Sequence, residues 1–303
     1  MKLPSFAFIK EVGPRDGLQN EKKIVGTKDK VKWIELLTEA GLSYIEVSSF
    51  VHPKWVPALA DAKDVFTMLE RNPHITYAAL VPNQQGLERA LLHNVDEVNV
   101  FLSASETHNK KNINKSMQEA LAVIEDVAKQ AHFAGKKVRG YVSTVFGCPY
   151  EGEVDIDVID ELCNQLFSYG IYEVSLGDTI GVGNPVQVER VLEHLLAKYD
   201  STKFAMHFHN TYGMALANVV KSLECGITVF DSSCGGLGGC PYAPGASGNV
   251  ATNDLVHMLH KMGVQTNVNE EKLLQASKFI QNKLDMPLPS NVYRALEHKL
   301  VSR

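Results

Sequence analysis

The chain has 303 residues, of which 45% are hydrophobic and 21% charged, and its formal net charge is −5. This composition is typical of a folded protein with a sizeable core and excludes a largely disordered chain. The slightly acidic balance, with both signs interspersed, argues against a nucleic-acid partner, and no segment is apolar for long enough to cross a membrane.

Residues 1–12 lack the basic and apolar regions of a secretion signal. The five cysteines are odd in number and show no spacing typical of a metal ribbon. We therefore expect reduced thiols and a cytoplasmic protein.

Short β-branched or aromatic runs alternate with stretches of helical period, a pattern typical of βαβ units and a parallel sheet. The predicted strands lie near residues 6–12, 44–48, 76–81, 97–102, 138–145, 172–176, 204–209 and 229–232. The predicted helices lie near residues 27–40, 58–71, 84–93, 116–134, 156–169, 185–198, 213–225 and 250–262. Gly41, Gly135, Gly170 and Gly226 each follow a helical stretch and precede a strand, as C-terminal helix caps do.

Eight such units are the number that closes an α/β (β/α)8 TIM barrel. An open doubly wound sheet is less favoured, because no G-x-G-x-x-G motif follows the first strand. Residues 270–284 and 291–301 are predicted to be extra C-terminal helices around a proline-rich turn. No linker divides the chain, so we expect residues 1–303 to form a single catalytic domain.

The active site of such a barrel lies at the carboxyl ends of its strands, which we call the barrel mouth. His207 and His209 alternate along a predicted strand and so point the same way, which makes half of a metal site. Asp16 could be a plain turn residue, or a third ligand beside the histidines. Asn249 could cap the following helix or donate a carbonyl oxygen to the ion. The mixed nitrogen and oxygen set suits Mg or Mn.

Glu46 interrupts an apolar strand, so it points inward or is buried with a partner, for which Arg15 is the nearest candidate. Such a pair could be purely structural, or it could hold the arginine ready to stabilise an oxyanion. The glycine-rich residues 234–249 could cradle a phosphate or form a mobile lid that carries a reactive Cys240. Cys148, Cys163 and Cys225 are interpreted as packing residues.

Four stretches carry a family resemblance: residues 11–21 (EVGPRDGLQNE), residues 175–183 (SLGDTIGVG), the strand with His207 and His209, and residues 235–249 (GGLGGCPYAPGASGN). Over essentially its whole length the chain resembles the 3-hydroxy-3-methylglutaryl-CoA lyases. The arginine–aspartate pair and the His-x-His strand are shared more widely with homocitrate and isopropylmalate synthases. The resemblance implies a metal-dependent enzyme, usually a homodimer, that cleaves its acyl-CoA substrate to acetyl-CoA and acetoacetate in leucine degradation and ketone-body metabolism.

The resemblance also implies roles for individual residues. Asp16, His207, His209 and Asn249 would hold the divalent cation, Arg15 would stabilise the enolate, Cys240 would transfer a proton, and Glu46 and Asp178 would support the site. The general base is left open between His207, Asp178 and a metal-bound water. Lys22 and Lys23 could reach the phosphates of coenzyme A, or could simply be solvated.

Two positions depart from the family pattern, because Asn210 stands where Asp is common and Asn253 where Glu is common. Both changes remove negative charge near the expected metal, which bears on how the site is tuned. Two other functions are compatible with the sequence: a related condensing enzyme or aldolase that acts on 2-oxo acids, and a barrel that binds metal or coenzyme A without catalysis.

Overall fold

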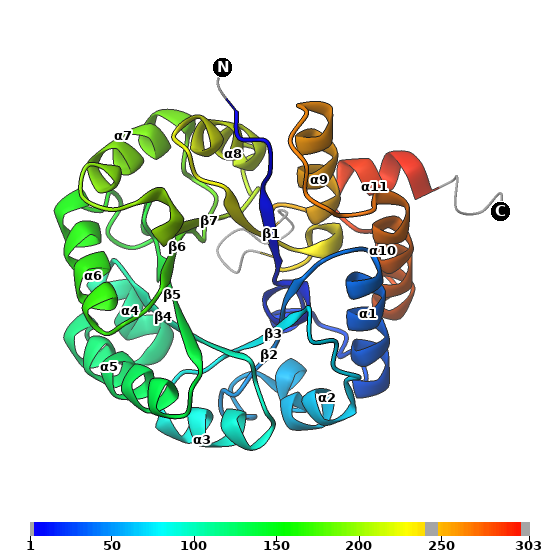
Figure 1. Cartoon of the computed structure of the whole chain (residues 1–303), viewed down its shortest axis with the longest axis horizontal. Helices are drawn as coiled ribbons and strands as arrows, with labels where there is room; N and C mark the ends of the chain where they lie inside the picture. The colour runs from blue at the N-terminus through cyan, green and yellow to red at the C-terminus, as the bar shows by residue number, and fades with distance from the viewer. Residues whose placement is uncertain (1–2, 240–247, 298–303) are drawn as a thin grey trace.

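Eight parallel strands pair in chain order and close into a barrel, with β1 hydrogen-bonded to β8. The computed structural model describes residues 3–239 and 248–297. Helices surround the barrel on the outside (Figure 1), which confirms the predicted (β/α)8 fold. The strands are β1 Phe8–Glu11, β2 Tyr44–Ser49, β3 Thr76–Leu80, β4 Glu97–Ser103, β5 Lys137–Ser143, β6 Glu173–Asp178, β7 Phe204–Phe208 and β8 Val229–Ser232.

The helices occupy the predicted stretches, with one addition. They are α1 Thr27–Glu39, α2 Ala62–Met68, α3 Gln84–Leu92, α4 Glu106–Ile113, α5 Met117–Phe133, α6 Ile156–Ser168, α7 Pro185–Leu196, α8 Ala215–Glu224, α9 Thr252–Lys261, α10 Glu270–Leu284 and α11 Asn291–Leu296. In Figure 1, α10 and α11 lie on one side of the barrel beside α1 and α9. No helix within residues 3–239 and 248–297 has the length and apolar character needed to cross a membrane.

Three local features differ from the sequence prediction. Helix α4 was not predicted because it is almost entirely polar; it begins after Ser105, whose side chain accepts a hydrogen bond from the His108 N–H at 3.1 Å. Helix α2 is shorter than predicted because Pro57–Leu59 forms a separate 3-10 turn. Residues Gly13–Gly17 form a π-helical turn directly after β1.

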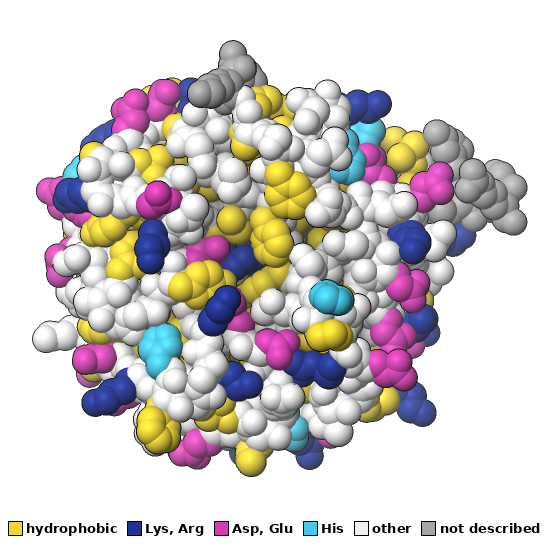
Figure 2. All heavy atoms as spheres, viewed as in Figure 1, with side chains coloured by type: hydrophobic (Ala, Val, Ile, Leu, Met, Phe, Trp, Pro, Cys, Tyr) yellow, Lys and Arg dark blue, Asp and Glu magenta, His cyan; other side chains and the backbone are white. Residues whose placement is uncertain are grey.

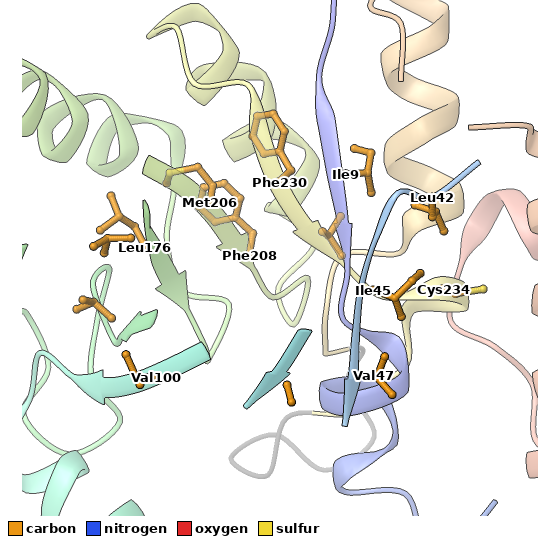
Figure 3. Packing of buried hydrophobic residues seen from close by; sticks show 14 of the residues in the cluster. Ile9, Leu42, Ile45, Val47, Val100, Leu176, Met206, Phe208, Phe230 and Cys234 are labelled. Carbon is orange, nitrogen blue, oxygen red and sulfur yellow. The ribbon is translucent and has the colours of Figure 1, made fainter. Parts of the chain in front are cut away.

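The apolar core lies between the strands and the surrounding helices. On β7, Phe204, Met206 and Phe208 are all fully buried and belong to this core. Figure 3 shows such side chains on several strands, including Met206, Phe208 and Phe230. Each fully buried side chain of this kind stabilises the fold by roughly 1.5–3 kcal/mol. Because successive side chains of a strand alternate, the opposite faces of the strands point into the barrel.

The inside of the barrel is polar rather than apolar. A closed series of contacts, which we call the interior ring, runs from the barrel floor to the mouth and back. Its members are Lys10, Tyr172, Glu97, Tyr44, Asn99, Glu46, Arg15, Asp16, His207, Asp231, Arg139 and Glu173. Buried charges are tolerated here because each has a partner.

The face drawn in Figure 2 carries acidic and basic side chains side by side, with a hollow near its middle. This face therefore shows no large patch of one sign, in keeping with the modest net charge of the chain.

Candidate active site

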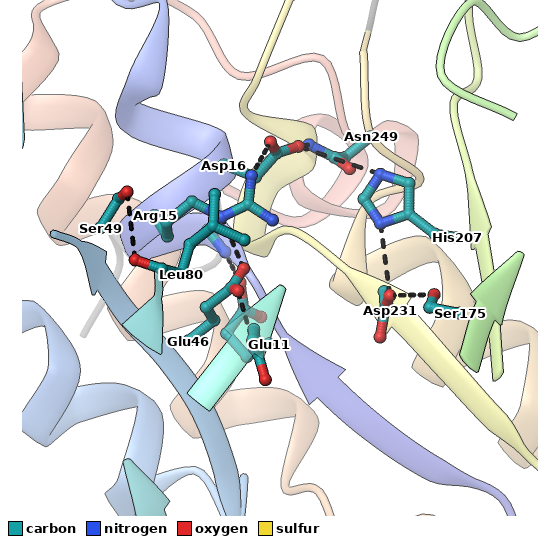
Figure 4. Close-up of polar contacts among 12 residues, drawn as sticks. Glu11, Arg15, Asp16, Glu46, Ser49, Leu80, Ser175, His207, Asp231 and Asn249 are labelled. Atoms are coloured by element: carbon teal, nitrogen blue, oxygen red, sulfur yellow. Dashed lines mark hydrogen bonds and ion pairs between the residues drawn. The ribbon is translucent and has the colours of Figure 1, made fainter. Parts of the chain in front are cut away.

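The structure brings Asp16, His207 and His209 together at the barrel mouth. Asp16 Oδ2 lies 3.9 Å from His207 Nε2 and 4.0 Å from His209 Nε2. One ligand atom from each residue lies within 4.8 Å of those of the other two, and this is the one such group of three or more in the described residues. Figure 4 shows Asp16 and His207 facing each other across the mouth. The geometry matches the predicted pairing of a carboxylate with two imidazoles.

The π-helical turn sets the position of Asp16. The backbone N–H of Asp16 donates to Val12 O at 2.7 Å, so the turn folds the chain back as soon as β1 ends. Asn249 then reaches Asp16 from the other end of the chain, because its Nδ2 donates to Asp16 Oδ2 at 2.7 Å and to Leu237 O at 3.1 Å. The interpretation of Asn249 as a helix cap is wrong, since α9 begins at Thr252 and Ala251 is its N-cap residue.

Electrostatics keep this group ready for a cation. Burial alone would raise the pKa of Asp16, but Arg15 and the two histidines outweigh it and lower that pKa to about 2. Burial and the neighbouring His207 lower the pKa of His209 to about 3, although Asp16 opposes them. An ionised carboxylate and a neutral imidazole each offer a lone pair. The donors therefore fit a divalent cation with oxygen and nitrogen ligands.

Arg15 lies beside this group and is fixed by two carboxylates. Its Nε donates to Glu46 Oε2 at 2.6 Å, and its Nη1 donates to Asp16 Oδ1. Glu46 is fully buried and also accepts a hydrogen bond from Asn99 Nδ2 at 2.8 Å. The predicted pairing of Glu46 with Arg15 is confirmed. The guanidinium is thus held by the protein before any ligand arrives.

Asp178 ends β6 at the same mouth. Its two carboxylate oxygens accept hydrogen bonds from the N–H of Val182 at 3.1 Å and of Gly183 at 2.8 Å. Gly183 must lack a side chain because a Cβ there would lie 2.9 Å from Asp178 Oδ2. Burial raises the pKa of Asp178 to about 6, against the lowering effect of the backbone hydrogen bonds. This carboxyl therefore changes its protonation state near neutral pH.

The other residues singled out in the sequence have other contacts, are exposed, or fall outside the described residues. Cys240 falls outside the described residues. Lys22 is exposed. Asn253 accepts a hydrogen bond from Gly235 N at 2.9 Å and donates to Ser277 Oγ at 3.0 Å, so it supports the start of the glycine-rich segment. The Asn210 side chain accepts a hydrogen bond from Ala215 N at 3.2 Å.

Tyr141 is a further residue of the mouth that was not predicted from the sequence. This residue lies on β5, and its ring centroid is 5.5 Å from Arg15 Cζ and 6.1 Å from the His207 ring. Its hydroxyl is buried and has no hydrogen-bond partner among the described residues. A buried hydroxyl without a partner marks a position where a ligand oxygen could bind. The alternation of Arg139, Tyr141 and Ser143 along β5 was the available signal, since these residues share one face of the strand.

Glu11 was also missed, and it ties the π-helical turn to the segment after β8. Its carboxylate accepts hydrogen bonds from Gly13 N and Cys234 N, both at 2.8 Å, and from Thr252 Oγ1 at 2.6 Å. Complete burial raises the pKa of Glu11 from 4.5 to about 7, although these hydrogen bonds oppose the shift. The group therefore binds its proton more tightly in the folded chain than in the unfolded chain.

This shift predicts a pH dependence of stability. Because the folded state holds the Glu11 proton more tightly, the free energy of unfolding should fall as pH rises from about 4.5 to about 7, by on the order of 3 kcal/mol. Glu11→Gln should flatten this part of the curve, since the amide carbonyl can still accept from Gly13 and Cys234. Urea unfolding at half-unit pH intervals would measure it. An unchanged slope in the variant would show that Glu11 is not the group responsible.

Comparison with known proteins gives full-length matches. The HMGL-like family model matches residues 7–280. The chain is 58% identical to the hydroxymethylglutaryl-CoA lyase YngG of Bacillus subtilis over 290 residues, covering 96% of this chain and 97% of that protein. A crystal structure of the Bacillus subtilis HMG-CoA lyase matches with a TM-score of 0.97 and 57% identity, covering 98% of this chain and 100% of that one.

A third match was solved with ligands. The structure of an HMG-CoA lyase from Acinetobacter baumannii in complex with coenzyme A and 3-methylmalate has a TM-score of 0.92 and 40% identity, with 97% of each chain covered. The matched stretch of the family model runs from the first strand to beyond the last and includes every mouth residue described above.

Proposed function

The chain belongs to the HMGL-like family, and from this premise we propose which of its mouth residues carry out the reaction of that family. It is a hydroxymethylglutaryl-CoA lyase, which cleaves 3-hydroxy-3-methylglutaryl-CoA to acetyl-CoA and acetoacetate. A condensing enzyme or aldolase for 2-oxo acids is not favoured, because relatives at this level of identity are lyases. The residue assignment rests on one observation. Asp16, His207 and His209 lie close together at the barrel mouth, and Arg15 is held beside them.

The proposed cation site consists of Asp16, His207, His209 and Asn249. When bound there, Mg or Mn would polarise the tertiary hydroxyl and the neighbouring carboxylate of the substrate. Asn249 would contribute Oδ1, because its Nδ2 already donates to Asp16 and Leu237. The choice of Mg or Mn rests on the mixture of oxygen and imidazole donors without thiolates.

Arg15 is the proposed stabiliser of the enolate. Cleavage of the carbon–carbon bond moves an electron pair onto the thioester carbonyl of the departing acetyl-CoA unit. The guanidinium uses Nε on Glu46 and Nη1 on Asp16, and in the described chain Nη2 has no hydrogen-bond partner. Nη2 is therefore the donor left for the thioester oxygen. A donor held in place in this way stabilises the transition state without further reorganisation.

Asp178 is the proposed general base for the substrate hydroxyl. His207 is the less suitable candidate, because an imidazole whose Nε2 binds a cation has no lone pair left to accept a proton there. A carboxyl with a pKa of about 6 is ionised enough at neutral pH to accept the proton and basic enough to hold it. Cys240, which lies outside the described residues, is the proposed proton donor to the acetyl-CoA carbanion. Its place in the glycine-rich segment after β8 supports this role.

Further proposals concern the rest of the substrate and the state of the protein. The exposed Lys22 follows the π-helical turn and is proposed as a contact for the phosphates of coenzyme A. We also propose a cytoplasmic homodimer. The location is supported by the four described cysteines, all of which are free thiols. The dimer rests on the family resemblance.

One pair of assays tests the assignment. The purified chain with Mg or Mn should release acetoacetate from 3-hydroxy-3-methylglutaryl-CoA, which can be followed spectrophotometrically. It should not condense acetyl-CoA with 2-oxo acids at a comparable rate. Condensation without acetoacetate release would contradict the assignment and support the related synthase instead.

A further inference from the structure

The two histidines of the cation site differ in what lies behind them. Nδ1 of His207 lies 3.4 Å from Asp231 Oδ2. Both Nδ1 atoms are buried, and neither makes a hydrogen bond among the described residues. No carboxylate oxygen is recorded within 4.0 Å of His209 Nδ1 in the described chain, where the ion pair of His209 is made through Nε2. The two rings are adjacent, with centroids 5.3 Å apart, so they share one environment on the side of the mouth. A carboxylate therefore backs only one of the two imidazoles.

Asp231 is held from three neighbouring strands. It lies on β8 directly opposite His207 of β7 in the strand register. Its Oδ2 accepts a hydrogen bond from Ser175 Oγ of β6 at 2.7 Å, and its Oδ1 accepts one from Arg139 Nη2 of β5 at 2.8 Å. Figure 4 shows Asp231 between Ser175 and His207. All four residues are buried, so the carboxylate has no freedom to turn away.

The carboxylate behind the ring favours one tautomer of a neutral His207. Oδ2 of an ionised Asp231 can only accept, so the ring nitrogen that faces it must be the one with the proton. The other nitrogen, Nε2, then keeps its lone pair, and it is Nε2 that lies 3.9 Å from Asp16 Oδ2. At 3.4 Å this is an electrostatic contact rather than a hydrogen bond of normal geometry.

We propose that Asp231 is a positioning residue that holds His207 in the Nδ1–H tautomer and so presents its Nε2 lone pair to the cation. The inference rests on the proposed cation site and adds a residue that touches neither substrate nor cation. Arg139 and Ser175 orient Asp231 in turn. Carboxylates that support a ligating histidine in this way commonly contribute 10–100-fold, as an order of magnitude, to metal affinity.

The variant Asp231→Asn tests this role directly, because it should reverse the tautomer of His207. Arg139 can only donate, so it should hold the amide carbonyl of the new side chain, and the amide nitrogen should then face Ser175 and His207. That nitrogen donates a proton, so Nδ1 of His207 must accept and the ring proton must move to Nε2. The shape of the side chain is nearly unchanged, but the nitrogen that faces the mouth can no longer bind a cation.

The matched control is Glu97→Gln. Glu97 is another buried carboxylate of the interior ring, and it accepts hydrogen bonds from Tyr44 and Tyr172. It has no contact with His207 or Asp231 among the hydrogen bonds and ion pairs of the described chain. This control therefore shows the effect of removing a charge from the interior ring while the Asp231 carboxylate behind His207 stays in place. Ser175→Ala is a milder second variant, because it removes one of the donors that orient Asp231.

The experiment has two readouts that do not depend on turnover. Nitrogen-15 NMR of the metal-free protein at pH 8 should show the His207 proton on Nδ1 in the wild type and in Glu97→Gln, and on Nε2 in Asp231→Asn. The dissociation constant for Mn²⁺, measured by electron paramagnetic resonance, should rise about 10–100-fold in Asp231→Asn. It should rise less in Ser175→Ala and stay within about twofold of the wild type in Glu97→Gln, in keeping with the same estimate.

An Asp231→Asn protein with an unchanged tautomer, or with Mn²⁺ affinity equal to that of Glu97→Gln, would overturn the role of Asp231. The tautomer result in the metal-free protein bears on Asp231 alone. Failure of the proposed cation site would look different, because the wild type itself would then bind no Mn²⁺. If Asp231→Asn does not fold, the wild type decides the matter, because a His207 proton on Nε2 in the metal-free wild type would overturn the role of Asp231.

Discussion

Asp16→Ala should leave the protein without its bound cation and lower kcat/KM by roughly 10³-fold or more. Asp16 supplies the only carboxylate of the proposed ligand set, and its Oδ2 lies about equally far from both imidazoles. A metal that polarises a reacting oxygen contributes several kcal/mol to the transition state, and each 1.36 kcal/mol is about tenfold in rate. Elemental analysis after gel filtration would give the occupancy, and acetoacetate release would give the rate.

His209→Ala should lose the cation in the same way, because it removes one of the two imidazoles. The matched control is His257→Ala, which removes a half-exposed histidine that contacts Glu270 on α10 and is far from β7 in the chain. This control should keep full occupancy. Full occupancy in both Asp16→Ala and His209→Ala would overturn the ligand assignment.

Arg15→Met should keep the cation but lower kcat by about 10²–10³-fold, the usual cost of losing one preorganised oxyanion donor. KM should change little, because the interaction is made mainly in the transition state. Arg15→Lys should not restore the rate. The three donors of a lysine ammonium all lie on one nitrogen, whereas Arg15 bonds Glu46 and Asp16 through two separate nitrogens and keeps a third for the thioester.

The Arg15 result needs a control for folding. Arg15→Met leaves the buried Glu46 carboxylate without its guanidinium partner. Breaking a buried ion pair in this way lowers the free energy of unfolding by about 3–5 kcal/mol. Combining Arg15→Met with Glu46→Gln removes the unpaired charge and should recover much of the thermal stability. The rate should stay low in this double variant. A rate that recovers together with stability would show that Arg15 acts through the fold rather than on the enolate.

The barrel could be predicted from sequence because its strands and helices have distinct periods and are separated by turn residues. Helix α4 could not, since it has no apolar face to mark it in the sequence; its side chains make the Ser105 cap and an exposed Glu106–Lys110 ion pair. The π-helical turn could not be predicted either. The proline and two glycines of residues 13–17 indicate a turn but do not distinguish a π-helical turn from other kinds.

The candidate cation site was predictable because its members lie where strands end, and the barrel fold places all strand ends at one mouth. Residues one layer deeper were not. Asp231 and Arg139 are 92 residues apart in the chain, and nothing local to either one identifies the other as its partner. The alternation of Tyr141 with Arg139 and Ser143 along β5 indicates only that these residues share one face of the strand. Only the closed barrel shows that the Tyr141 hydroxyl lacks a partner.

The interior ring has a consequence for how this sequence can diverge. A single substitution that leaves one of its buried charges without a partner lowers the free energy of unfolding by about 3–5 kcal/mol. This is a large part of the roughly 5–15 kcal/mol by which proteins are typically stable. Members of the ring should therefore change in lineages only together, as compensating pairs drawn from strands such as β5 and β8. Neutral substitutions should then be found mainly on the outer faces of the helices. The residues that line the barrel should change rarely, even at positions far from the reacting atoms.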